Sequence, residues 1–361
     1  SQHPLQPGRA EIGHGGICKK RSPGKDFLEK QMIHGTGDNS LPATTLCLGY
    51  TSYRLETLPF VRNRMRRYQC IALEEPPTPG FKEMLRQELD IEEYLLLTDF
   101  GFPEFARQQC RLLQELYAEG KTILQVEPFL QELVNIHEYF AAGGSPPGIP
   151  KGTTTREVYD CEKLWTGRLL SFYQKSRSRE FARIVQAVKD FSRMDAQKGR
   201  LRDEMRGQAL QDLFRFYQSM YVEAGYIHFV LLKELYQRLP QSYSLQTFYS
   251  LQSFFKPRIG KRQILGPGDV LTLIYTWRPD YQGPRTDLLA AQSLIYNKIV
   301  YKEEIQEEPE SCPHSRDEIQ AVQLARSLDY EQCEELFQEI RHLPTAQAGE
   351  KAQAWLRRKR Q

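Results

Sequence analysis

The chain of 361 residues is 40% hydrophobic and 11% aromatic, so it can bury the core of one large domain or of two modest ones. A formal net charge of +3 with 26% charged residues offers no broad attraction to nucleic acid or to an anionic membrane, so neither is expected as a partner. No apolar run approaches the roughly 20 residues of a membrane-spanning helix and no signal pattern opens the chain, which predicts a cytoplasmic protein without a membrane span.

The cysteines argue against both a disulfide framework and a structural zinc cluster. There are seven, they are scattered, and none forms a Cys-x-x-Cys pair. Cys47 and Cys70 lie within apolar runs, where a thiol usually serves packing and not chemistry.

The first 44 residues have no helical or alternating period and are dense in Gly, Pro, Ser and charge, which predicts a disordered segment. The first methionine is Met32, so we expect residues 1–31 to come from an upstream extension and not from the fold. The ordered part is predicted to be a single α/β domain over residues 45–305, followed by a helical C-terminal tail over residues 306–361.

Short apolar runs alternate with longer helical patterns from Leu46 onward. Five runs are predicted as strands: Thr45–Gly49, Gln69–Glu74, Thr122–Glu127, Met220–Gly225 and Val270–Thr276. The first four do not alternate with polar residues, as expected for strands that are covered on both faces. This pattern predicts an α/β fold with a central, mostly parallel sheet flanked by helices.

Two further segments shape the predicted fold. Phe129–Gln218 has almost no strand signal, so we expect a large helical insertion that roofs one end of the sheet. Phe254–Tyr275 contains the turn Gly266–Gly268, which suggests two late strands joined by a tight connection. In the tail, the apolar spacing indicates a helix packed on the domain or on a partner.

Polar side chains follow the predicted strands at their carboxyl ends: Ser52, Glu74, Glu75, Glu127, Glu223 and His228. In an open parallel sheet, sites form in the crevice beyond these ends. Glutamates and a histidine at one rim can bind a divalent metal, with Glu74 and His228 as ligands, or can act as general acid and base. The structural alternative is that Glu74 and Glu127 only accept hydrogen bonds at helix starts.

Four short motifs occur in a set order: "GYTS" at Gly49–Ser52, "IALE" ending at Glu74, the pair Arg202 and Asp203, and "GYIH" at Gly225–His228. This order resembles the superfamily that joins erythromycin esterases, haem-binding ChaN-like proteins, and the TraB and Tiki proteins. The family pattern is GxxH after the first strand, a glutamate ending the second, an Arg-Asp pair opening a helix, and a second GxxH. The likeness spans Leu46–Leu239 and departs at Ser52, which stands where the family has histidine.

The resemblance implies a hydrolase-like or metal-binding protein. Glu74 is then a ligand or general base, His228 a ligand or acid/base, and Arg202 a clamp for an anionic group, with Arg177 or Arg179 as alternatives. The expected substrate-binding positions are Ser52, Tyr50, Glu75, Asp203, Glu127 and Glu223. A divalent metal or haem is the implied cofactor, and the ligand is a small molecule or a peptide.

The runner-up interpretation is a non-catalytic member of the same superfamily that binds haem, another ligand or a protein partner. Ser52 favours it, because loss of one motif histidine is how such a site decays. We expect Glu74, His228 and Arg202 to converge at the carboxyl ends of the strands, with Ser52 on the wall of the cleft. Substrate, metal identity and oligomeric state are left open at this stage.

Overall fold

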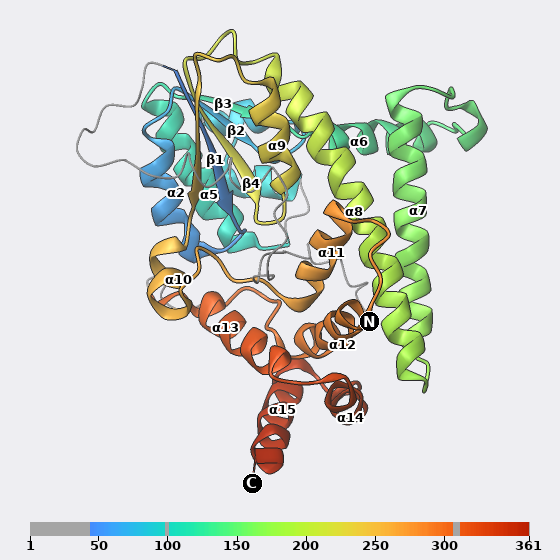
Figure 1. Cartoon of the computed structure of the whole chain (residues 1–361). Helices are drawn as coiled ribbons and strands as arrows, with labels where there is room; N and C mark the ends of the chain where they lie inside the picture. Colours follow the sequence, from blue (N-terminus) through green and yellow to red (C-terminus); the bar gives the residue numbers. More distant parts are fainter. Residues whose placement is uncertain (1–43, 98–100, 306–310, 361) are drawn as a thin grey trace.

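A computed structural model describes residues 44–97, 101–305 and 311–360. Within these residues one five-stranded sheet has the order β3-β2-β4-β1-β5, and all of its pairings are parallel. The strands are β1 (Thr45–Thr51), β2 (Cys70–Leu73), β3 (Thr122–Gln125), β4 (Ser219–Gly225) and β5 (Ser244–Tyr249). The predicted α/β fold with a mostly parallel central sheet is therefore confirmed (Figure 1).

Helices cover both faces of the sheet because side chains alternate between two apolar layers. Cys47, Ile71 and Tyr221 lie in the core shared with α2 (Leu58–Met65), α3 (Phe81–Leu85), α4 (Ile91–Leu96) and α5 (Pro103–Ala118). Leu48 and Val222 lie in the opposite core, which is closed by α9 (Phe229–Arg238) and the end of α8 (Phe181–Gln211). Strands buried in this way have no polar face, which explains their unalternating sequences.

The predicted late strands are wrong. Val270–Thr276 lies within the helix α11 (Pro267–Trp277), and the segment before it forms α10 (Gln252–Ile259). Gly266 caps α11, because the Asp269 carboxylate accepts a 2.6 Å hydrogen bond from the Gly266 N–H. A helix that is buried on nearly all sides needs apolar residues all round, and its sequence then looks like that of a buried strand.

The large helical insertion is present. It consists of α6 (Pro128–Ala141), the short 3-10 turn η2 (Pro146–Gly148), α7 (Thr154–Lys175) and α8. α7 and α8 lie side by side (Figure 1), and with α6 they enclose a small core of Phe129, Ile136, Val158, Cys161 and Met194. The insertion therefore has its own packing as well as the walls that it provides to the site described below.

The C-terminal helices are α12 (Pro284–Ile299), α13 (Pro313–Arg326), α14 (Tyr330–Ile340) and α15 (Thr345–Arg360). They share a core with α11 and the first half of α8, in the lower part of Figure 1. This agrees with the expectation that the tail packs on the domain. Its predicted start falls in residues 306–310, which lie outside the described residues, as does the predicted disordered segment except for residue 44.

The η1 turn (Leu55–Thr57) fastens the C-terminal helices to the sheet. The Glu56 carboxylate accepts hydrogen bonds from the backbone N–H groups of His314 (3.1 Å) and Ser315 (3.0 Å) at the start of α13. Arg54 adds an ion pair of 2.8 Å with Glu318 on the same helix. The loop after β1 is therefore held by groups that lie more than 250 residues later in the chain.

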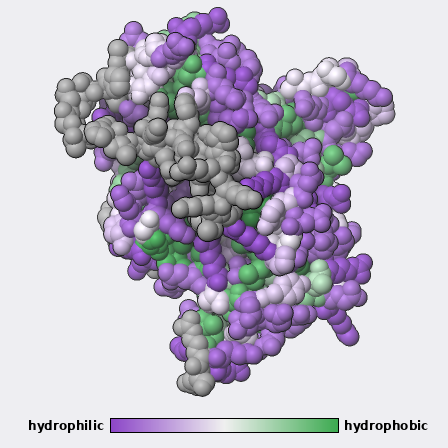
Figure 2. All heavy atoms as spheres, viewed as in Figure 1, coloured by the Kyte–Doolittle hydropathy of each residue, from purple (hydrophilic) through white to green (hydrophobic). Residues whose placement is uncertain are grey.

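On the face shown in Figure 2, hydrophilic residues predominate and hydrophobic ones appear in small separate areas. In the described part of the chain, none of the helices combines the length and the apolar character needed to cross a membrane.

Candidate functional site

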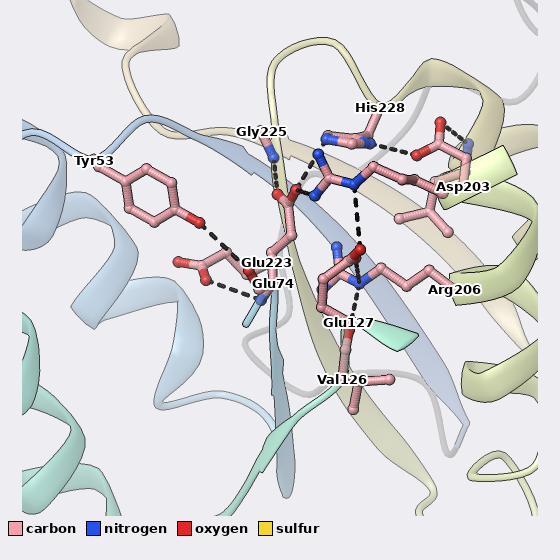
Figure 3. Close-up of polar contacts among 11 residues, drawn as sticks. Tyr53, Glu74, Val126, Glu127, Asp203, Arg206, Glu223, Gly225 and His228 are labelled. Carbon is pink, nitrogen blue, oxygen red and sulfur yellow. Dashed lines mark hydrogen bonds and ion pairs between the residues drawn. The ribbon is translucent and has the colours of Figure 1, made fainter. Parts of the chain in front are cut away.

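Glu74 is placed by the pairing of two neighbouring strands. β2 ends at Leu73, and β2 and β4 run parallel with Ala72 opposite Val222, so Glu74 lies beside the end of β4. The Gly225 N–H donates a 2.7 Å hydrogen bond to Glu74 Oε2, and the Glu74 N–H donates a 3.3 Å bond to Glu223 Oε2 (Figure 3). The strand ends therefore hold this carboxylate before any other side chain contributes.

Two cationic side chains meet the other oxygen of Glu74. Arg202 Nη2 lies 3.1 Å from Glu74 Oε1, and His228 Nε2 lies 2.9 Å from the same atom. Glu74 itself is 1% exposed. The predicted convergence of Glu74, His228 and Arg202 at the carboxyl ends of the strands is thus what the structure has.

His228 is held between two carboxylates. Its Nε2 faces Glu74, and its Nδ1 is hydrogen-bonded to Asp203 Oδ1, while Asp203 Oδ2 accepts a 2.9 Å bond from the Leu231 N–H (Figure 3). Burial disfavours a charged imidazole, but Glu74 and Asp203 outweigh it and raise the pKa of His228 to about 9. At neutral pH the ring is an imidazolium with both N–H groups donating.

α8 supplies the remaining cations from one face. Arg202 and Arg206 are one turn apart, and the Glu127 carboxylate lies between them, 3.2 Å from Arg202 Nε and 3.9 Å from Arg206 Nε. Arg206 Nε also donates a 2.8 Å bond to the Val126 carbonyl oxygen. We call the six residues Glu74, Glu127, Asp203, Arg202, Arg206 and His228 the charge network; its three carboxylates face three cations.

Glu223 lies behind Glu74 as a second buried carboxyl. Burial, with the Glu75 charge, raises its pKa to about 7, against the effect of the hydrogen bond from the Glu74 amide. Glu223 therefore gains or loses a proton near neutral pH.

Three other predicted positions, Tyr50, Ser52 and Glu75, differ in their burial and in their hydrogen-bond partners. Tyr50 is fully buried in the core, where its ring stacks on Tyr249 with centroids 4.9 Å apart. The Ser52 hydroxyl is buried and has no hydrogen-bond partner among the described residues, although the Ser52 carbonyl accepts a 3.1 Å bond from Thr57 Oγ1. Glu75 accepts a 3.1 Å bond from Gln125 Nε2.

A cavity of about 1380 Å³ lies against this site. Glu74, Glu75 and Tyr53 line it from the strand ends, and α7, α8, α12 and α14 supply most of the opposite walls. The insertion thus contributes to the enclosure through α7 and α8. Neither Tyr50 nor Ser52 lines this cavity, so the expectation that Ser52 forms part of the wall is wrong.

A second cavity of about 20 Å³ lies beneath His228, next to Asp203 and Asp195. It has room for about one water molecule and polar groups to bind it. Asp195 lines both cavities, so this carboxyl connects the charge network with the larger space.

Asp195 was not predicted as a site residue. Its Oδ1 accepts a 2.9 Å bond from Trp165 Nε1, and burial raises its pKa against the effects of Trp165 and Lys198. It follows no strand and lies in the middle of α8. The available signal was its spacing, because Asp195 precedes Arg202 by seven residues and so lies on the same helical face.

The described residues do not fit a metal ion. Both nitrogens of His228 are engaged by carboxylates, and Glu74 is surrounded by Arg202, His228 and the Gly225 N–H. No group of three or more His, Cys, Asp or Glu side chains in the described ranges is arranged to hold one. The charged side chains of the site are instead paired with one another.

The chain is similar to an uncharacterized protein of Archaeoglobus fulgidus, with 29% identity over 292 residues, which are 80% of this chain and 96% of that relative. No family model matches the sequence. No solved structure matches it. The relative's name states no activity.

Proposed function

We propose that this protein is a hydrolase of the erythromycin esterase, ChaN-like and TraB/Tiki type that works with carboxylates and without a metal. Glu74 is the general base that takes a proton from the attacking water. The observation that carries this proposal is that Glu74 lines the large cavity while its position is held by Arg202, His228 and the Gly225 N–H.

The two oxygens of Glu74 have different partners. Arg202 and His228 donate to Oε1, the Gly225 N–H donates to Oε2, and Oε2 is the oxygen that we assign to the attacking water. Water bound there would lose its proton to Oε2 as its oxygen attacks the electrophilic carbon of the substrate. Arg202 and His228 are positioning residues, because neither lines the large cavity.

Asp195 is the candidate acid. It lines the same cavity, and its raised pKa favours a protonated carboxyl that can donate to the leaving group. Glu74 contacts two cations, whereas Asp195 is partly buried. Two carboxyls in such different environments can serve as base and acid at one pH. After product release Glu74 gives its proton to solvent and Asp195 takes one from solvent, which restores both carboxyls and completes the cycle.

The test is hydrolysis of p-nitrophenyl esters of acetate, butyrate and palmitate, together with a generic peptide and a glycoside series. We expect one of these classes to be cleaved, and Glu74→Gln to lower kcat by about 100-fold or more. Asp195→Asn should shift the acidic limb of the pH–rate profile. Glu115→Gln, an exposed glutamate paired with Arg62, is the matched control. Wild-type activity retained by Glu74→Gln would disprove the proposed base.

A non-catalytic binding protein is the second candidate. The observation that favours it is Ser52, whose buried hydroxyl has no partner among the described residues at the position where the family has histidine. Two measurements address it: an absorption spectrum after haem addition, and calorimetric titration with zinc and manganese. We expect no metal binding in the wild type or in Ser52→His, Glu74→Gln and His228→Ala; a specific haem spectrum without esterase activity would favour the binder.

A further inference from the structure

The large cavity has a lining that the proposed chemistry does not use. At about 1380 Å³ it exceeds the roughly 300 to 1,000 Å³ of pockets for drug-sized ligands. Much of its wall is aromatic or aliphatic, formed by Phe102, Phe105, Leu169, Phe172, Phe191 and Phe337. Such a wall binds an extended apolar body.

The charged groups of the lining divide into two classes. The carboxylates have partners within the chain: Glu74 pairs with Arg202, Glu318 with Arg54, and Asp269 accepts from the Gly266 N–H. Four cations in the lining form no ion pair or side-chain hydrogen bond with any described residue; we call them the cationic wall, and they are Arg177, Arg179, Lys298 and Lys302.

Lys298 and Lys302 are two neighbouring members of the cationic wall. Desolvation lowers the pKa of both side chains, and the nearby Lys298 charge lowers the pKa of Lys302 further. Lys298 is half-buried at the end of α12, and Lys302 is exposed three residues beyond that helix. Two ammonium groups that repel each other at the edge of an apolar cavity are stabilised by an anion placed between them.

The cavity extends along α7 and α8. Its lining on α8 runs from Val188 to Asp195, over which the helix rises by about 10 Å at 1.5 Å per residue, and on the facing part of α7 it begins at Leu169. A ligand that fills the cavity therefore lies along both helices.

We propose that the large cavity binds an elongated amphipathic anion, a carboxylate or a phosphate on a long acyl or alkyl chain. Its charged group lies at Lys298 and Lys302, and its apolar chain lies against the phenylalanine-rich wall. As a substrate class, this rests on the proposed hydrolase and implies cleavage of a long-chain ester that also carries an anionic group. As a binding property, it stands without catalysis.

The test is calorimetric titration of the full chain with palmitate, hexadecyl phosphate, neutral hexadecanol and butyrate. We expect one of the two long anions to bind in the micromolar range and to prefer the protein over hexadecanol by about tenfold or more. Palmitate alone would identify a fatty carboxylate as the ligand, and hexadecyl phosphate alone an alkyl phosphate. Butyrate should bind weakly, because it fills little of the apolar wall.

The double variant Lys298→Gln/Lys302→Gln should weaken binding of the long anion by about tenfold and leave binding of hexadecanol unchanged. The matched control is Lys151→Gln/Arg168→Gln, which removes two exposed cations that do not line the cavity. Equal binding of palmitate, hexadecyl phosphate and hexadecanol, equal loss in both double variants, or no binding of any long ligand would each overturn the proposal.

Glu74→Gln separates the two proposals. Binding of the long anion that persists in this variant, with hydrolysis lost, agrees with both. Binding without hydrolysis of any ester by the wild type leaves the anion site standing and removes the hydrolase. If the rate of hydrolysis changes neither in Lys298→Gln/Lys302→Gln nor with the charge of the substrate, the anion site is disproved and the hydrolase remains.

Discussion

The charge network and the cationic wall are two charged regions beside one cavity, and they are built in opposite ways. In the network, each of Glu74, Glu127 and Asp203 faces a cation from the same chain at short range. In the wall, Lys298 and Lys302 have no such partner among the described residues. Where charges are paired within the chain, removing one partner leaves the other buried and uncompensated, whereas unpaired cations are available to an anionic ligand.

The largest effect is expected where the network is cut. Glu127→Ala leaves Arg202 and Arg206 without their shared carboxylate, and Arg206 is only 1% exposed. The free energy of unfolding should fall by about 3 to 5 kcal/mol in urea denaturation, because a buried cation loses its partner. Glu115→Ala, which breaks an exposed pair with Arg62, should cost at most about 1 kcal/mol. Similar losses of unfolding free energy in Glu127→Ala and Glu115→Ala would contradict the expected difference between the buried network and an exposed pair.

The next effect is a dependence of stability on pH. The pKa of His228 is about 9 in the folded protein, against 6.5 when unperturbed, so the folded state holds this proton more tightly. The contribution is complete below pH 6.5 and is lost as the pH rises through 9, for a total of roughly 3 kcal/mol. The difference in unfolding free energy between wild type and His228→Gln should therefore narrow from pH 6 to pH 9. A constant difference would mean that the imidazole is not charged.

Glu223 should act in a lower pH window. Its pKa is raised from 4.5 to about 7, so the folded protein loses stability as the pH rises between these values. Glu223→Gln keeps an oxygen for the Glu74 N–H and removes the buried charge. It should gain about 2 to 3 kcal/mol at pH 8 and nothing at pH 4, as measured by urea denaturation at both values. A gain of the same size at pH 4 would point to packing instead of ionisation.

The smallest effect belongs to the cationic wall. Lys298→Gln removes a half-buried ammonium that has no carboxylate partner among the described residues. Thermal denaturation of the ligand-free protein should show a gain below about 1 kcal/mol, because no attractive pair is lost. A clear destabilisation would show that Lys298 stabilises the fold, as the residues of the charge network are expected to do.

The sequence predicted the parts of the fold whose patterns have one meaning. β1, β2 and β4 are fully or largely buried strands, and their unalternating runs were recognised as such. β3 is a partly buried edge strand and was recognised from a similar run. Two errors came from ambiguous patterns. The run inside α11 is apolar because that helix is buried. β5 was missed because it is a partly exposed edge strand in which Ser, Gln and Thr interrupt the apolar residues.

The site divides along the same line. Glu74 and His228 were found because each lies just beyond a strand end, and Arg202 came from the family pattern. Tyr50 and Ser52 also lie near a strand end, but their side chains point into packed surroundings, which position along the chain does not reveal. Lining residues such as Asp195 and Lys298 depend on how helices far apart in the sequence pack, and no local pattern encodes that.

α8 has a consequence for how the molecule comes apart. Its 31 residues contribute Phe181 and Ile184 to the C-terminal core, Met194 to the core of the insertion, and Leu210 to one face of the sheet. Because α8 contributes to three cores, it cannot separate from one of them without disturbing the other two. Although the chain is large enough for two domains, its described parts should melt as one cooperative unit, with a single calorimetric transition whose van't Hoff and calorimetric enthalpies agree.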